Sequence, residues 1–318
     1  MPFDFSQVTA PFRMQPGLRR LAPGQAQLTP SRPNGRHLRE KIAVLATTAD
    51  EALLAVRGFD ATPAFLAIAA EAARDAAPHA GPAFVFDSSA DCAAPRVGWA
   101  LRAGQPQGDG DPAIGEILAA LPEAKRATAL LCLAFEEDFA IIDGATATLP
   151  WLAVCLPSRW APAEKIGRHF AQVHAPVADN ALLIEASDRL ARLVTGTDRW
   201  ERFVWTISAD PRLHQHPARG RVDWPDEADA ESIAAAASLR HEHQTFIPMP
   251  GTGQAVFTIR VASEPLDAAL RTRDDAARLH DAIASMSPAV LAYRGLAPVR
   301  ERLLEALRRR IDTLPAAG

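Results

Sequence analysis

Hydrophobic and polar residues recur with two different periods along the chain, and these periods predict helices on either side of a group of strands. Helical spacing of apolar residues occurs over 62–76, 112–121, 162–173 and 181–194, and from 274 to the C-terminus. Short apolar runs separated by acidic or Gly-containing segments predict strands at 130–135, 139–142, 149–155, 203–207, 239–247 and 255–261. The last two runs flank Pro-Gly-Thr-Gly, which predicts a hairpin.

The segments outside these elements complete the predicted layout. Residues 1–60 carry six prolines and little periodicity, so we expect an extended arm that packs on the body of the protein. Residues 77–111 predict mostly loop, with a short strand at 83–86. Sequential strands, a helix and further strands between outer helices are typical of an antiparallel sheet with helices on one side. The sequence therefore predicts an α+β fold in which residues 61–318 form a single domain.

Composition and charge are those of an ordinary globular protein. Of the 318 residues, 48% are hydrophobic and 23% are charged, and the net charge of −4 offers no positive field for nucleic acid. Cys92, Cys132 and Cys155 are too widely spaced and odd in number for a disulfide framework. The N-terminal residues lack a basic segment followed by an apolar core, and no stretch of about 18 apolar residues occurs. We therefore expect a cytoplasmic protein that binds neither nucleic acid nor a membrane.

Histidines are the first candidates for chemistry, because no glycine fingerprint of a nucleotide site and no Gly-x-Ser-x-Gly motif is present. His241 and His243 lie two residues apart on a predicted strand and project from one face. His214 and His216 repeat this spacing in a loop. Either pair could bind zinc or iron, although a third ligand and supporting hydrogen bonds would be needed. A metal site on these pairs is therefore one interpretation, and surface or hydrogen-bonded histidines are the other.

His174 differs from the other histidines in its place at the C-terminal end of the predicted helix 162–173, opposite the sheet. Its ring could reach a ligand held between helix and sheet, or it could hydrogen-bond the last carbonyls of its own helix. Arg240, Glu242 and Gln244 share one face of the strand 239–247. That face is either solvated or a buried polar row, and buried polar rows tend to be functional.

Several motifs in a fixed order carry a resemblance to a known family. They are Pro11-Phe-Arg-Met14, Trp160-Ala-Pro-Ala-Glu-Lys-Ile-Gly-Arg168, Val173-His-Ala-Pro-Val177, Trp205-Thr-Ile207, Leu239-Arg-His-Glu-His-Gln-Thr245 and Phe257-Thr-Ile-Arg260. Together these segments resemble the haem-dependent oxidative N-demethylase alpha-subunit family. The resemblance covers nearly the whole chain.

The resemblance implies a PAS-like fold that holds a b-type haem and uses O2 to demethylate a small secondary amine such as dimethylamine, with release of formaldehyde. It also implies that a separate subunit with FMN and an iron–sulfur cluster delivers electrons from NADPH. The predicted layout agrees, because the helix that carries His174 falls between the first and last strands. We therefore expect His174 to be the axial iron ligand, with a Cys155 thiolate as the alternative.

The resemblance further implies roles for polar residues of the presumed pocket. Lys165, Arg168 and Arg240 would pair with the haem propionates. Glu242 would be the distal carboxylate, which counters the charge of an ammonium substrate and supplies a proton near the iron. Gln244 would orient this carboxylate or bound oxygen. Three further residues on presumed pocket strands are expected to contact the cofactor: Arg202, Trp205 and His243.

The chain departs from the family pattern at three positions. The family usually has Arg at the position of His243, Asn at the position of Val204 and Pro at the position of Ala178. A guanidinium and an amide are thereby missing from the presumed pocket, which bears on propionate pairing, haem binding and substrate choice. Two alternatives to the enzyme follow: a PAS-like haem or small-ligand sensor without turnover, and a non-haem metal protein that uses the His-x-His pairs.

Overall fold

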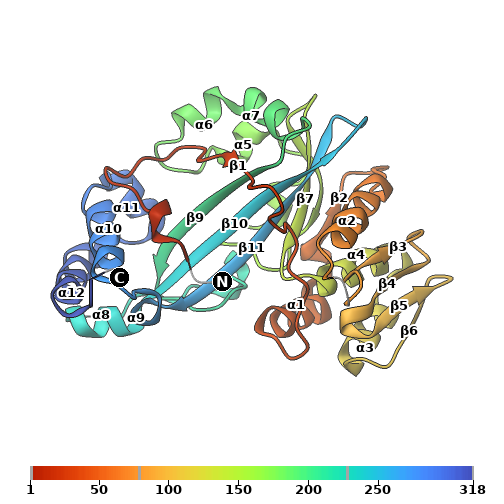
Figure 1. Ribbon diagram of the computed structural model, residues 1–318, viewed down its shortest axis with the longest axis horizontal. Helices are drawn as coiled ribbons and strands as arrows, with labels where there is room; N and C mark the ends of the chain where they lie inside the picture. Colours follow the sequence, from red (N-terminus) through yellow and green to blue (C-terminus); the bar gives the residue numbers. More distant parts are fainter. Residues whose placement is uncertain (1–2, 78–79, 227–228, 317–318) are drawn as a thin grey trace.

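A seven-stranded antiparallel sheet forms the centre of the computed structural model, which describes residues 3–77, 80–226 and 229–316 (Figure 1). The strands lie in the order β1-β9-β10-β11-β7-β8-β2. Their bounds are β1 (Arg19–Arg20), β2 (Leu53–Ala55), β7 (Asp138–Asp143), β8 (Thr148–Ala153), β9 (Trp200–Ser208), β10 (Ser238–Met249) and β11 (Gln254–Pro265). The α+β class is thereby confirmed, whereas the PAS-like character of the fold stays a prediction.

The hairpin of β10 and β11 is the longest paired unit of this sheet and was predicted from the sequence. Its register runs from Ser238 opposite Pro265 to Met249 opposite Gln254 without interruption. The turn at 250–253 contains Gly251 and Gly253. Both have a left-handed backbone conformation, which glycine adopts without strain because it has no Cβ. This long ladder fixes which side chains of β10 share a face.

A second sheet occupies the segment that we expected to be mostly loop. Its four antiparallel strands are β3 (Val85–Phe86), β4 (Cys92–Ala94), β5 (Trp99–Arg102) and β6 (Gln105–Gly108). The expectation for 77–111 was therefore wrong beyond the first strand. Strands of two to four residues are too short to show a period of two. The frequent Gly and Pro residues of this segment therefore led to the prediction of a loop.

Helices surround the central sheet, and their bounds are α1 (Arg36–Ala52), α2 (Thr62–Arg74), α3 (Pro112–Ala120), α4 (Glu123–Ala134), α5 (Phe170–His174), α6 (Ala181–Glu185), α7 (Ser187–Val194), α8 (Ala230–Ala236), α9 (Leu266–Ala269), α10 (Arg273–Ala284), α11 (Pro288–Arg294) and α12 (Arg300–Thr313). Short 3-10 turns are η1 (Phe5–Gln7), η2 (Pro95–Val97), η3 (Pro162–Glu164), η4 (Pro217–Arg219) and η5 (Ala297–Val299). In the described part of the chain, no helix is long and apolar enough to cross a membrane.

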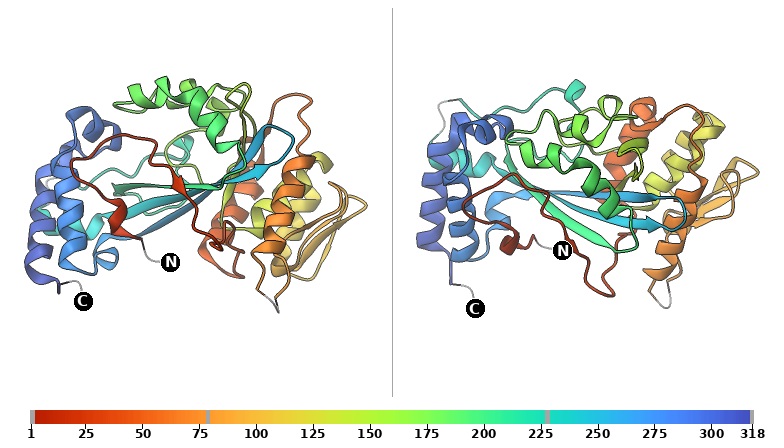
Figure 2. Two further views of the ribbon diagram at one scale, coloured as in Figure 1. Left: turned by 45° about the horizontal axis from the view of Figure 1, so that its top comes forward. Right: turned by 90° about the horizontal axis from the view of Figure 1, so that it is seen from above.

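These helices cover both faces of the sheet, so the expected placement on one side was wrong. Apolar residues of α1, α2 and α4 pack with Ile141, Trp151 and Ile247 in one cluster. Residues of α5 and α7 pack with Ala140, Leu152 and Phe246 in another. Because side chains alternate along a strand, these two clusters lie on opposite faces. Figure 2 shows α5, α6 and α7 as one layer over β9 and β10.

Three predicted elements differ from the structure. The segment 130–135, expected as a strand, belongs to α4, whose last eight residues are all buried. Residues 36–55, expected within an extended arm, form α1 and β2. The single helix expected over 162–173 is divided into η3 and α5, with Gly167 in the left-handed region between them. The helices predicted near 62–76, 112–121 and 181–194 are confirmed, the last with a break at Ala186.

Candidate functional site

Four polar residues from the sequence analysis lie on one face of β9 and β10, the face covered by α5–α7, which we call the α5 face. In the ladder, Gln244 lies opposite Arg202, and Glu242 lies opposite Val204. Strand alternation places Arg240, Glu242 and Gln244 on the same side as Arg202. Arg240 and Gln244 are buried and Glu242 is half-buried. The row is therefore a covered polar row and not the solvated face of a sheet.

Glu242 is held in a fixed orientation by two neutral groups. The hydroxyl of Ser158 donates a hydrogen bond to Oε1, and Gln244 Nε2 donates to Oε2 over 2.6 Å. The expectation that Gln244 orients this carboxylate is thus matched by the geometry. Ser158 is not among the candidates from the sequence, because its contact with a residue 84 positions away cannot be read from residue spacing.

Arg240 positions Ser158 instead of offering its charge to a ligand. Its Nε and Nη2 donate to Ser158 Oγ over 3.0 and 2.8 Å. The remaining donors reach the carbonyls of Arg212 and Leu213, each over 2.9 Å. Burial lowers the pKa of Arg240 to about 10, which Glu242 partly opposes. Since the donors are already used within the protein, the structure gives no support to Arg240 as a propionate partner.

Arg202 is the opposite case, because its guanidinium forms no hydrogen bond or ion pair with any residue that the structure describes. Its Nε is buried without a partner, and so is the indole Nε1 of Trp200 two residues earlier on the same face. Burial lowers the pKa of Arg202, and the only opposing influence is the charge of Glu242. Buried donors without acceptors are rare in native proteins and call for an explanation such as a ligand. Trp200 was not among the candidates from the sequence.

His174 is the last residue of α5 and faces this polar row. Its Nδ1 lies 2.9 Å from the carbonyl oxygen of Phe170, so Nδ1 carries the proton and donates. The Phe170 ring also contacts the imidazole, with 4.2 Å between ring centroids. The capping interpretation of His174 is therefore confirmed. With Nδ1 protonated, Nε2 keeps a free lone pair, which is the state that a metal ligand needs.

The surroundings of His174 keep its ring neutral. Burial lowers the pKa of His174 to about 4, the Phe170 carbonyl opposes this, and the charges of Arg202 and Lys165 lower it further. These cations therefore lie within electrostatic reach of the ring. The amide of Asn180 donates to the carbonyl of His174 over 3.1 Å and anchors the chain after α5. The imidazole is thus neutral, oriented and backed by a fixed loop.

Lys165 and Arg168 lie at the outer edge of the same segment. Lys165 is half-buried and donates through Nζ to the carbonyl of Val173 over 2.8 Å. Arg168 is exposed. Both cations therefore stand near α5 where water reaches them, and both could meet an anionic group at the rim of the α5 face.

Two residues expected to contact the cofactor lie on the opposite face of the sheet. His243 Nε2 lies 2.7 Å from Glu201 Oε2, and its ring stacks on Phe203 at 4.5 Å. Trp205 belongs to a separate apolar cluster with Phe12 packed against it. The substitution at His243 therefore concerns the packing of this second face, and the structure does not bring His243 or Trp205 to His174.

The His-x-His pairs acquire other partners. His241 contacts the ring of Phe3 at 4.9 Å, and His214 Nδ1 binds the carbonyl of Cys155. His216 caps η4. Within residues 3–77, 80–226 and 229–316, no group of three or more His, Cys, Asp or Glu side chains is placed to hold a metal ion. The non-haem metal interpretation therefore gains no support from the described residues.

Cys155, the alternative axial ligand, lies in the cluster packed against α4, on the face away from His174. It is fully buried next to Cys132, and both the neighbouring thiol and burial raise the pKa of Cys155 well above its ordinary value. A thiol in such surroundings stays protonated, whereas iron ligation by cysteine requires the thiolate. The geometry therefore favours His174.

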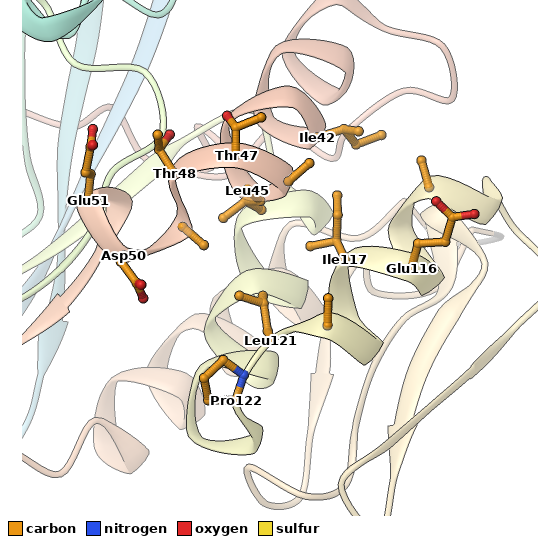
Figure 3. A pocket seen from close by; sticks show the side chains of 14 residues that line it. Ile42, Leu45, Thr47, Thr48, Asp50, Glu51, Glu116, Ile117, Leu121 and Pro122 are labelled. Carbon is orange, nitrogen blue, oxygen red and sulfur yellow. The ribbon is translucent and has the colours of Figure 1, made fainter.

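A cleft of about 690 Å³ lies elsewhere, between the C-terminal half of α1 and α3 (Figure 3). Leu45, Ile117 and Leu121 line it, and the carboxylates of Asp50 and Glu116 stand toward its two ends. None of the candidate residues from the sequence lines this cleft. The cleft is therefore separate from the α5 face.

The residues of the α5 face fit a haem. A b-type haem needs an axial base with a free lone pair, cations for its propionates and apolar surroundings. His174 Nε2 would supply the first, and Lys165 and Arg168 would supply the second. Apolar side chains complete the set in the cluster that joins α5 and α7 to the sheet: Phe170, Val173, Val194, Phe246 and Phe257. Among the described residues, the two partnerless donors of β9 likewise indicate a bound group with acceptor atoms.

Comparison with protein-family models agrees with the resemblance seen in the sequence. The model described as haem-dependent oxidative N-demethylase, alpha subunit-like, matches residues 114–304, which is more than half of the chain. The matched segment includes His174, Arg202, Glu242 and Gln244. The chain therefore belongs to the haem-dependent oxidative N-demethylase alpha subunit-like family.

Proposed function

We propose that this member of the family binds haem b through His174 and, with O2, oxidatively demethylates a small secondary amine, releasing formaldehyde. The observation that carries the proposal is the neutral imidazole of His174, whose Nε2 lone pair is free, on the same sheet face as the fixed carboxylate of Glu242. An axial base and a counter-charge for an ammonium substrate are thus present on one side of the sheet.

The side chains of the α5 face would orient the substrate and hold protons, while the bound haem supplies the redox chemistry with O2. Glu242 would attract the ammonium group of the amine. Ser158 and Gln244 hold both carboxylate oxygens, so the charge is oriented before the substrate arrives. Glu242 would also accept and return a proton at its carboxylate.

Lys165 and Arg168 would pair with the haem propionates, because both precede α5 and reach solvent, and the charge of Lys165 acts on the His174 ring. Arg240 takes a different part in this proposal. Its donors hold Ser158 against Glu242, so it is a positioning residue. Electrons would come from NADPH through FMN and an iron–sulfur cluster on a separate reductase subunit, as the resemblance to the family implies.

The test of haem binding is the ultraviolet–visible spectrum of protein expressed with a haem precursor. We expect a Soret band in the parent, its loss or shift in His174→Ala, and an unchanged band in the control His216→Ala, which alters a histidine outside the α5 face. A parent that stays free of haem under these conditions would overturn the proposal.

The test of turnover uses Glu242→Gln, which keeps the shape of the side chain and removes its charge. We expect unchanged haem content and a loss of reductase-dependent formaldehyde release of at least about 100-fold, the scale of a positioned acid–base group. If Glu242→Gln empties the haem site instead, the residue is structural. A parent that binds haem but releases no formaldehyde with a reductase and amine would leave the sensor as the better interpretation.

A further inference from the structure

Strand β9 carries two buried hydrogen-bond donors that no described residue satisfies. They are the indole Nε1 of Trp200 and the Nε of Arg202, two residues apart and therefore on the same side of the strand. Folded proteins leave few buried donors unpaired, because each one has lost water without gaining an acceptor. Two such donors on one strand face indicate that a ligand brings the acceptor.

A carboxylate suits these donors best. The guanidinium of Arg202 keeps a positive charge, and it has no ion-pair partner in the described chain. Guanidinium groups bind carboxylates through paired hydrogen bonds, and such charge-assisted bonds are stronger than neutral ones. Burial lowers the pKa of Arg202 although the charge of Glu242 opposes the shift, and no carboxylate of the described chain pairs with the guanidinium directly. An anionic ligand atom beside Arg202 would provide this pairing.

Glu242 supplies the opposite charge two residue pairs along the same ladder. Its hydrogen-bond partners, Ser158 and Gln244, are both neutral, and the charges of Arg202 and Arg240 act on it without a direct ion pair among the described residues. The residues opposite Glu242 on the neighbouring strands are Val204 and Val261, which are apolar. The α5 face therefore presents a separated cation and anion with apolar side chains beside them.

We propose that the amine bound at this face is an N-methylated amino acid rather than a simple alkylamine, with its carboxylate at Arg202 and Trp200 and its ammonium group at Glu242. The inference rests on the proposed function and deepens it by naming the substrate class. A zwitterion of this kind pairs with the charges of Arg202 and Glu242 and gives an acceptor to the donors of Arg202 and Trp200. Dimethylamine would satisfy Glu242 alone and leave Arg202 and Trp200 without acceptors.

A haem propionate is the other carboxylate that could reach Arg202. Propionates are ionised, and an ionised group is least costly to keep where water reaches it. Arg168 is exposed, and Lys165 and Arg202 are both half-buried, but the Nε of Arg202 is fully enclosed. The cations at the rim therefore suit the propionates, and Arg202 suits a small carboxylate that enters the covered part of the face.

Calorimetric titration of the haem-loaded protein with N-methylglycine and with dimethylamine, both secondary amines, tests the inference. We expect the parent to bind N-methylglycine at least about tenfold more tightly, since a hydrogen bond to a charged group contributes on that scale. Arg202→Met should reduce the ratio to about threefold or less. Arg189→Met removes an exposed arginine of α7 and should keep the full ratio. Haem content is measured for every variant.

The outcomes separate this inference from the proposed function. Equal or tighter binding of dimethylamine by the parent overturns the inference. So does an Arg202→Met protein that loses haem while keeping the preference, because Arg202 would then hold a propionate. A parent that loads no haem or releases no formaldehyde, yet shows the Arg202-dependent preference, refutes demethylation and leaves the carboxylate site standing.

Discussion

The neutral state of His174 has a consequence for stability that can be measured without haem. Burial holds the pKa of His174 at about 4 in the folded protein, whereas an unfolded chain has the ordinary value of 6.5. As the pH falls, the unfolded chain takes up the proton first. Stability associated with His174 is therefore complete above pH 6.5 and is lost progressively between pH 6.5 and pH 4.

The size of this effect follows from the shift. One pKa unit corresponds to about 1.4 kcal/mol, so the whole shift of His174 amounts to about 3 kcal/mol. At pH 4.5 the folded ring is still mostly neutral and the unfolded ring is almost fully protonated, which makes the loss about 2.5 kcal/mol. This is a large share of the roughly 5–15 kcal/mol that stabilises a typical domain.

The assay is urea unfolding of haem-free parent and His174→Gln at pH 7 and at pH 4.5. Glutamine does not titrate, so the variant should lose about 2 kcal/mol less free energy of unfolding than the parent over this interval. Between pH 7 and pH 8 the two proteins should differ by a constant amount. His241→Gln is a parallel case on the other face, because burial also lowers the pKa of His241 to about 4. Identical losses in parent and His174→Gln would refute the argument.

Two further predictions concern packing away from the α5 face. Lys41 is fully buried, with Nζ 3.2 Å from Asp138 Oδ1 and 3.0 Å from the carbonyl oxygen of Phe135, so Lys41→Met should cost about 3–5 kcal/mol by leaving Asp138 uncompensated. Chemical denaturation measures it, and a cost below about 1 kcal/mol would contradict the ion pair. Gly115→Ala should lower stability by about 1–3 kcal/mol, because a Cβ there would lie 2.1 Å from the indole of Trp99. A thermal melt unchanged by Gly115→Ala would contradict this close contact.

Two signals gave correct predictions. The helices α2 and α3 each have one covered face, which sets a period of 3.6, and the hairpin of β10 and β11 has a Gly-containing turn between two apolar runs. The prediction for 130–135 was wrong because α4 is buried on all sides over its last eight residues. A helix without a polar side has no period of 3.6 to detect, and a short apolar run then reads as a strand.

The N-terminal segment shows a different cause of error. Its prolines at 23, 30 and 33 precede α1, and no proline occurs between Pro33 and Pro63. The expectation of an extended arm was therefore carried from these prolines into residues 36–60, which contain no proline. Lys41 also gave no signal, since a lysine in the sequence predicts an exposed side chain, and only the fold brings Asp138 to it from nearly a hundred residues away.

Part of the site could be predicted from the sequence because it depends on alternation along single strands. The shared face of Glu242 and Gln244 follows from their spacing and needs no knowledge of the fold. The cofactor contacts predicted for other residues gained no support, because those side chains are placed by contacts between distant segments of the chain. Arg240 is turned away from a ligand by Ser158 and by the carbonyls near residue 213, and none of these contacts leaves a trace in the spacing of residues.

The two interpretations of His174, a cap on its own helix and an axial iron ligand, are compatible, because one contact serves both. The hydrogen bond from Nδ1 to the carbonyl of Phe170 is the capping contact, and it fixes the proton on Nδ1. A proton fixed there leaves the Nε2 lone pair free, and burial keeps a second proton from occupying it at neutral pH. The cap therefore creates the state in which this imidazole can hold iron.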